Sequence, residues 1–259
     1  MMKFKKILIV LFWIAALAGI VTMIVYAGSR YDNVAYKGYS INITASDDTE
    51  RLISKSDIEN IILTRTDSLI GRKFKDIDLV NLEKTLRENV YVNEAEISGD
   101  MWGNLQINVK QRKPIARIVN KENEQYYIDD LGGAMPIRPG MPARVIVVNG
   151  NISTKYSDFR ADTVIQEINA ILSCMNAINR DEFLKAQIGQ VFIDDNNDFI
   201  LIPLLGDHTV LLGSPYFADN RLENLKIFYK EGLGVEEWKK SKRIDIRFEN
   251  QVVVQNKNR

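Results

Sequence analysis

The stretch that decides the fold is Leu105-Gln106-Ile107-Asn108-Val109-Lys110, which Pro114 follows closely. Apolar and polar side chains alternate along it, as in a strand with one face in the core and the other in water. Pro114 has no amide hydrogen to give to a ladder, so we expect strand pairing to stop there. Residues 99–103 form a turn sequence, which predicts a preceding strand through Ala95 and Ile97.

Two helical patterns precede this hairpin. Ser56-Asp57-Ile58-Glu59 is a capping-box sequence, in which the serine hydroxyl and the glutamate carboxylate each accept from a free amide at a helix start. A second helix is predicted from about Asp78, which can cap it, with three leucines on one face. Residues 39–45 alternate like a first strand. The two helices must then cover one face of a three-stranded sheet, because neither can bury its apolar stripe alone.

The remainder is predicted to be mostly strands, with two helices. Helices are expected over about 162–179 and 218–231, the second ending at Gly232. Residues 244–248 alternate again, Glu249 and Asn250 form a turn, and Val252-Val253-Val254 makes a last strand. Apolar runs bounded by Gly, Pro or Asn give the other strands, at 115–119, 126–128, 145–148, 191–193, 199–205 and 209–212. We therefore expect an α+β fold.

The N-terminal residues differ from the rest. Residues 7–27 carry no charge and would reach about 31 Å as a helix, which matches a hydrocarbon core of about 30 Å. Lys3, Lys5 and Lys6 precede them, so the positive-inside rule places the N-terminus in the cytoplasm. We expect a single-pass type II transmembrane helix. A cleaved signal peptide ending at residues 25–27 is the alternative, although its apolar core would be unusually long.

Composition excludes several classes of function. The chain has 34 basic and 34 acidic side chains, so it offers no electrostatic footprint for nucleic acid. The single cysteine, Cys174, cannot form an internal disulfide, and we expect it to be buried. The single histidine, His208, lies in a predicted turn, and we interpret it as a surface residue rather than part of a triad. Asp194–Asp198 lacks the pattern of a calcium loop and is interpreted as a plain turn.

Four segments of the chain carry a resemblance to a known protein family. They are residues 89–97, NVYVNEAEI, residues 105–116, LQINVKQRKPIA, residues 128–132, IDDLG, and residues 244–248, IDIRF. Together they resemble the FtsQ/DivIB family of bacterial cell-division proteins. The first is similar to the start of a strand in that family's POTRA domain, and the second to its exit into a β domain, with Gln111 where the family usually has glutamate. The third is similar to a family turn, and the fourth to a segment near the C-terminus.

The resemblance implies a layout and a role. It implies a non-enzymatic divisome scaffold in the inner membrane, with its bulk in the periplasm and enriched at the division septum. Its partners would be FtsB/FtsL-type coiled-coil membrane proteins, and it would help to recruit and regulate septal peptidoglycan synthesis. It would need no cofactor, metal, nucleic acid or small-molecule substrate. The expected parts are a cytoplasmic tail at 1–6, the transmembrane helix at 7–27, a linker at 28–38, a βααββ POTRA-like domain at 39–113, an FtsQ-type β domain at 114–255 and a tail at 256–259.

The C-terminal strand is the first candidate for a partner site. An edge strand exposes unpaired N–H and C=O groups, to which a partner strand can add. The resemblance places the FtsB-type partner there, on Arg247, Phe248, Val252, Val253 and Val254. The alternative is that all three valines belong to the core. The exposed strand of the POTRA-like domain is a second candidate, and Trp102 in its turn is expected to pack rather than to bind.

Two other classes of function remain open. A membrane-anchored periplasmic enzyme could act on peptidoglycan through paired carboxylates, although no motif pairs two of them. A POTRA-bearing transport component would continue into a long membrane domain, for which the stretch after Pro114 is short.

Overall fold

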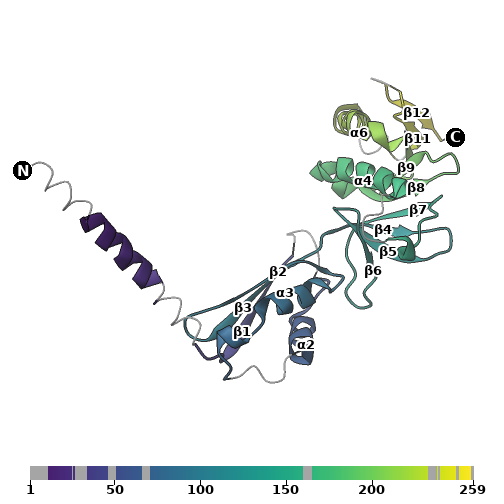
Figure 1. Ribbon diagram of the computed structural model, residues 1–259. Helices are drawn as coiled ribbons and strands as arrows, with labels where there is room; N and C mark the ends of the chain where they lie inside the picture. The colour runs from purple at the N-terminus through teal and green to yellow at the C-terminus, as the bar shows by residue number, and fades with distance from the viewer. Residues whose placement is uncertain are drawn as a thin grey trace, which may run out of the picture. The chain divides into compact units, whose positions relative to one another are not determined.

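The computed structural model divides the chain into two compact units, each with its own hydrophobic core (Figure 1). Unit 1 comprises residues 1–44 and 53–111, and unit 2 comprises residues 45–52 and 112–259. The α+β class expected from the sequence is confirmed. The structure describes residues 11–24, 26, 34–45, 51–65, 71–159, 165–232, 238, 240–248 and 251–257.

The described N-terminal part is a helix over residues 11–24 whose apolar side chains are mostly exposed. Among the residues that the structure describes, none of the helices combines the length and the apolar character needed to cross a bilayer. The transmembrane helix expected at 7–27 includes residues 7–10, 25 and 27, which lie outside the described residues. The expected tail at 1–6, the first part of the linker, 28–33, and residues 258–259 of the tail expected at 256–259 also lie outside them. Asn256, which was expected in that tail, belongs to the last strand instead.

Unit 1 has the expected order of strand, two helices and two strands. Strand β3 lies in the centre of the sheet, parallel to β1 and antiparallel to β2. The apolar residues of α2, α3 and all three strands form one core, so both helices cover the same face of the sheet (Figure 1). The elements are β1 (Gly38–Thr44), α2 (Lys55–Arg65), α3 (Leu79–Arg87), β2 (Val92–Gly99) and β3 (Asn104–Gln111), with a 3-10 turn at Phe74–Asp76.

The two helix starts of unit 1 differ in how well the sequence predicts them. Asp78 caps α3 as expected, accepting from the Asn81 amide at 3.0 Å. The box predicted at Ser56 and Glu59 is wrong by two residues. The Ser54 hydroxyl accepts from the Asp57 amide at 3.2 Å, and the Asp57 carboxylate accepts from the Ser54 amide at 2.7 Å. Since α2 begins at Lys55, Ser54 is the residue that can satisfy the free amides of the first turn.

Unit 2 is built on a nine-stranded mixed sheet in the order β12-β11-β10-β9-β8-β7-β4-β5-β6. The pairs β4–β7, β7–β8 and β10–β11 are parallel, and the other neighbours are antiparallel. Pro114 begins β4 instead of ending a ladder, a position where its missing amide hydrogen is tolerated. The strands are β4 (Pro114–Val119), β5 (Gln125–Asp129), β6 (Ala134–Pro136), β7 (Ile146–Gly150), β8 (Ile188–Ile193), β9 (Phe199–Pro203), β10 (Thr209–Gly213), β11 (Ser241–Asp245) and β12 (Val253–Asn256).

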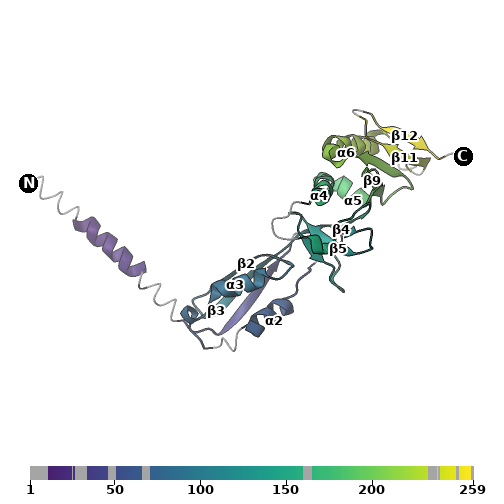
Figure 2. The same cartoon turned by 45° about the vertical axis from the view of Figure 1, so that its right-hand side comes forward.

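Three α-helices in the described part of unit 2 pack on its sheet (Figure 2). These are α4 (Gln166–Asn179), α5 (Glu182–Gln187) and α6 (Ala218–Ile227), which continues as a wider π-turn over Phe228–Gly232. The sequence predicts only two helices, because six residues are too few to show a helical period. The start of α5 is nevertheless encoded by Asp181, whose carboxylate accepts from the amides of Phe183 and Leu184. Residues 162–164 of the first predicted helix lie outside the described residues.

Candidate functional site

Strand β12 ends the sheet of unit 2, because among the described strands only β11 pairs with it. The Lys257 amide donates to the Lys240 carbonyl across this ladder at 2.9 Å. Backbone polar groups alternate in direction along a strand, so Val254 and Asn256 turn theirs toward the open side. The edge predicted from the sequence is therefore available to a partner strand.

The three C-terminal valines, of which Val252 directly precedes β12, point alternately to the two faces of the sheet. Val252 packs against the core of unit 2, and Val254 is partly buried opposite Ile244. Val253 keeps 47% of its surface exposed. The reading that all three valines are core is therefore wrong, since one of them faces solvent. The predicted turn at residues 249–250 lies outside the described residues.

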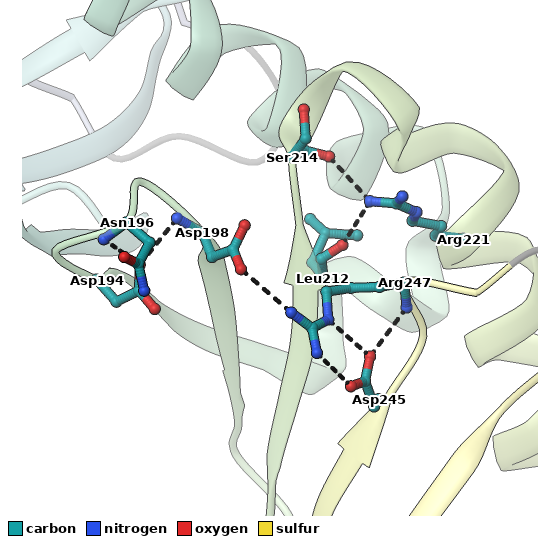
Figure 3. A network of polar contacts seen from close by, with 8 residues as sticks. All are labelled: Asp194, Asn196, Asp198, Leu212, Ser214, Arg221, Asp245 and Arg247. Carbon is teal, nitrogen blue, oxygen red and sulfur yellow. Dashed lines mark hydrogen bonds and ion pairs between the residues drawn. The ribbon is translucent and has the colours of Figure 1, made fainter.

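Arg247 lies at the centre of a network of hydrogen bonds and ion pairs near the end of β11, the strand that pairs with β12 (Figure 3). Its guanidinium donates to Asp245 through Nε at 3.1 Å and Nη2 at 2.8 Å, and its backbone amide donates to the same carboxylate. Its Nη1 reaches the Asp198 carboxylate at 3.4 Å. Asp198 belongs to the β8–β9 turn, in which the Asp194 carboxylate accepts from the amides of Asn196 and Asp198. The turn predicted at Asp194–Asp198 is thus confirmed.

Gly213 allows the network to form. Its φ is +73°, a left-handed backbone conformation that residues other than glycine rarely adopt. A Cβ there would meet Cγ and Cδ of Arg247 at 2.9 Å. Beside it, Nη1 of Arg221 from α6 donates to the carbonyl oxygens of Leu212 and Ser214 (Figure 3). Sequence reasoning missed Gly213 and Arg221 as site residues, although a glycine ending an apolar strand is a usable signal for close approach.

A hollow of about 640 Å³ opens next to Arg247. Phe248 leaves half of its surface exposed there, and the Arg221 guanidinium lies 5.3 Å from the ring centre of Phe217 on the other side. A second hollow of about 330 Å³ continues along α6 to Val252 and shares Asn224 with the first. The lining of the larger hollow is Phe217, Asn220, Arg221, Glu223, Asn224, Arg247 and Phe248. The site thus combines an open backbone edge with a mixed apolar and cationic surface.

Strand β2 forms one edge of the sheet in unit 1, and side chains of α3 bond to its outward backbone groups. The Ile97 amide donates to the Glu83 carboxylate at 2.8 Å, and the Arg87 guanidinium donates to the Ala95 carbonyl at 2.9 Å. Glu83 and Arg87 also pair with each other at 3.0 Å on the surface of α3. These side chains occupy backbone groups that an added strand would need. Strand addition at β2 therefore requires the pair to be displaced.

Two of the residues singled out in the sequence take positions opposite to those expected. Trp102 does not pack, because 67% of its surface is exposed. His208 is 2% exposed, and its Nε2 lies 2.7 Å from the Tyr229 hydroxyl, so it is not a surface residue. It is buried because Tyr229 and Trp238, which follow it in sequence, close over it. Burial lowers the pKa of His208 and disfavours its charged form.

Cys174 is fully buried on α4, as the sequence predicts, and burial raises the pKa of its thiol to about 12. A protonated, inaccessible thiol is unreactive. Within the part of the chain that the structure describes, no three His, Cys, Asp or Glu side chains come together in a way that could hold a metal ion.

Two family models match the chain. One, for a POTRA-like domain, matches residues 37–110, and the other, described as FtsQ/DivIB, C-terminal related, matches residues 113–255. No curated protein matches the chain. The class defined by fold and sequence is therefore a protein with a POTRA-like unit followed by an FtsQ/DivIB-type β unit whose last strand is an open edge. Since the second model covers more than half of the chain, the protein belongs to the FtsQ/DivIB family of cell-division proteins.

Proposed function

We propose that this protein is a non-enzymatic scaffold of the divisome that binds an extended segment of an FtsB/FtsL-type membrane protein along β12. The observation that carries the proposal is the open edge of β12, next to which Phe248 and the Arg247 network line a hollow. An added strand would bond to the backbone of Val254 and Asn256, and its side chains would contact Val253 and the hollow. By holding such partners, the protein would help to recruit and regulate septal peptidoglycan synthesis.

The membrane location is proposed from the sequence. Residues 7–27 are uncharged and long enough to cross a bilayer as a helix, and Lys3, Lys5 and Lys6 favour a cytoplasmic N-terminus. We infer a single-pass anchor in the inner membrane, with the units that follow it in the periplasm and the protein enriched at the division septum. Extraction of cell membranes at alkaline pH tests this location. Release of the full chain into the soluble fraction would contradict it.

The enzymatic alternative can be examined at a hollow of about 480 Å³ that is lined by two carboxylates, Glu167 and Asp198. Glu167 accepts from the amide and hydroxyl groups of both Ser153 and Thr154. Asp198 accepts from Arg247. Because both carboxylates already have structural partners, the hollow does not present an acid and a base that are free to act on a substrate. No observation therefore favours catalysis here.

A substitution at Val254 tests the partner site. Proline at this position removes the outward amide hydrogen and adds a ring at the edge, while the amides that pair with β11 stay in place. Val254→Ala is the matched control, because it loses a similar part of the side chain but keeps the amide. We expect Val254→Pro to weaken binding of the full chain to the FtsB/FtsL-type proteins by about fivefold, since a net hydrogen bond contributes about 1 kcal/mol.

The two variants are compared by pull-down and by titration, with circular dichroism as the check that both are folded. Binding by Val254→Pro that equals binding by Val254→Ala would remove β12 as the docking edge. Failure of the unsubstituted protein to capture any such partner, together with normal septation on depletion, would refute the scaffold role as a whole.

A further inference from the structure

The turn between β2 and β3, which we call the hairpin tip (residues 100–103), presents two large apolar side chains to solvent. Met101 is 73% exposed and Trp102 is 67% exposed. The turn is nevertheless well ordered by its own bonds: the Asp100 carboxylate accepts from the amides of Trp102 and Asn104 at 2.9 and 2.8 Å. Large apolar side chains that an ordered turn keeps exposed to water indicate a surface that binds another molecule or a membrane.

The hairpin tip lies where the chain arrives from the N-terminal apolar segment. The Lys37 amide donates to the Gly103 carbonyl at 2.7 Å. The Tyr36 amide donates to the Arg72 carbonyl and the Phe74 amide to the Val34 carbonyl, so residues 34–36 are bonded to residues 72–74. Gly103 has a φ of +99°, and a Cβ on it would meet the Ala35 carbonyl oxygen at 2.4 Å. Residues 34–37, 71–74 and 100–103 therefore form one end of unit 1.

Chain length keeps this end near any bilayer that holds residues 7–27. From Ala27 to Val34 the chain can span at most about 25 Å, even when fully extended. The exposed cations at this end are Lys37, Arg72, Lys73 and Lys75. The acids there are the exposed Asp76 and the half-buried Asp100. Tryptophan prefers the level of lipid headgroups, where its ring is partly apolar and its N–H can find a partner. Neighbouring lysine and arginine side chains are attracted by anionic headgroups.

We propose that the hairpin tip contacts the surface of the bilayer that anchors the chain, with Met101 and Trp102 at headgroup level and the surrounding cations facing anionic lipids. The inference rests on the membrane anchorage proposed above. Such a contact adds a second attachment to the anchor and sets the orientation of unit 1 toward the bilayer. The contact would therefore restrict the rotation of unit 1 relative to the membrane. Unit 2, with the proposed docking edge, follows unit 1 in sequence.

The test uses the full chain reconstituted into vesicles of phosphatidylcholine and phosphatidylglycerol. An environment-sensitive fluorophore is attached to Met101→Cys, and Asn93→Cys, exposed at the opposite end of β2, is the matched control. The native Cys174 is buried and does not compete for the label. We expect the emission at position 101 to shift to the blue and to be quenched by lipids that carry a spin label at the headgroup, while position 93 stays aqueous. The signal should weaken in vesicles of phosphatidylcholine alone and in the variant Lys37→Gln/Lys75→Gln.

Flotation of the same samples separates the two proposals. If the protein floats with the vesicles but the label at 101 stays aqueous, the anchor stands and the bilayer contact is overturned. If the protein does not float, the anchorage and the contact that depends on it both fail. A label that leaves water only when a partner protein is added would assign the hairpin tip to protein docking and would also overturn the lipid contact.

Discussion

The Arg247 guanidinium and the Asp245 carboxylate form a bidentate pair across the end of β11, with Nε and Nη2 at 3.1 and 2.8 Å from the two carboxylate oxygens (Figure 3). Partial burial acts to raise the pKa of Asp245, but the bonds and charge of Arg247 outweigh it and hold this pKa below its usual value. The pair fixes the chain where it leaves the sheet toward Phe248. It therefore links the core of unit 2 to the proposed docking surface.

Replacement of Asp245 by asparagine should weaken partner binding more than it weakens the fold. The variant keeps the size of the side chain but removes the charge that orients Arg247. We expect binding to fall about threefold to tenfold, with less than about 1 kcal/mol lost from the free energy of unfolding, because Arg247 remains partly exposed. Asp195→Asn, in the exposed β8–β9 turn, is the control. Equal affinity of the two variants would show that the network does not shape the site.

Gly213 should be one of the least replaceable residues of unit 2. Gly213→Ala places a Cβ in a left-handed backbone and against the Arg247 side chain. Gly140→Ala is a close control, since Gly140 has a similar φ of +81° but open space around its Cα. We expect about 1 kcal/mol of destabilisation for Gly140→Ala and about 2–3 kcal/mol for Gly213→Ala. Chemical denaturation measures both values, and equal losses would mean that the close approach carries no cost.

Loss of the Glu83 carboxylate should open the β2 edge of unit 1. In Glu83→Ala the Ile97 amide loses its acceptor and is left to water, so its hydrogen exchange should become faster. The free energy of unfolding should fall by about 1 kcal/mol. Glu96→Ala, which removes an exposed acid from β2 itself, is the control. Unchanged exchange at Ile97 would contradict the assignment of Glu83 as the group that closes this edge.

The buried His208 should make stability depend on pH in the mildly acidic range. Burial lowers its pKa in the folded state below the ordinary value of 6.5. A backbone bond at Trp238 and the charge of Asp207 raise this pKa more weakly, and the charge of Lys257 lowers it further. The unfolded chain then binds the proton more readily. The stability that uncharged, buried His208 contributes is therefore fully present above about pH 6.5. This contribution is lost as the pH falls from there through the folded-state pKa of His208.

His208→Gln keeps a polar partner for the Tyr229 hydroxyl but cannot titrate. We expect its free energy of unfolding to change less between neutral and mildly acidic pH than that of the unsubstituted protein. The carboxyl groups with lowered pKa, Asp100, Asp181 and Asp245, change stability only as the pH falls below their ordinary value of 3.8. Parallel pH curves for the two proteins would show that His208 does not contribute.

Periodicity and caps predicted much of each unit, and the errors have local or tertiary causes. The alternation of Leu105, Ile107 and Val109 correctly gave the central strand of unit 1, since burial of every second side chain is written directly in the sequence. The capping box was predicted two residues too late, because Ser54 and Ser56 both offer a hydroxyl. Which of them caps the helix depends on the residue at which the helix begins. The exposure of Trp102 could not be read from a single residue in a turn.

By itself, the sequence determined the order of most elements, the polar and apolar faces of most strands, the burial of Cys174 and the family to which the chain belongs, because these depend on spacing along the chain or on local motifs. Only the tertiary structure decided which strands become neighbours when they lie far apart in the sequence. The parallel pairing of β10 with β11 brings Gly213 against Arg247, and the β8–β9 turn adds Asp198. Alternation says that a strand has a buried face, but the choice of partner depends on how distant segments together fill one core, which no local pattern records.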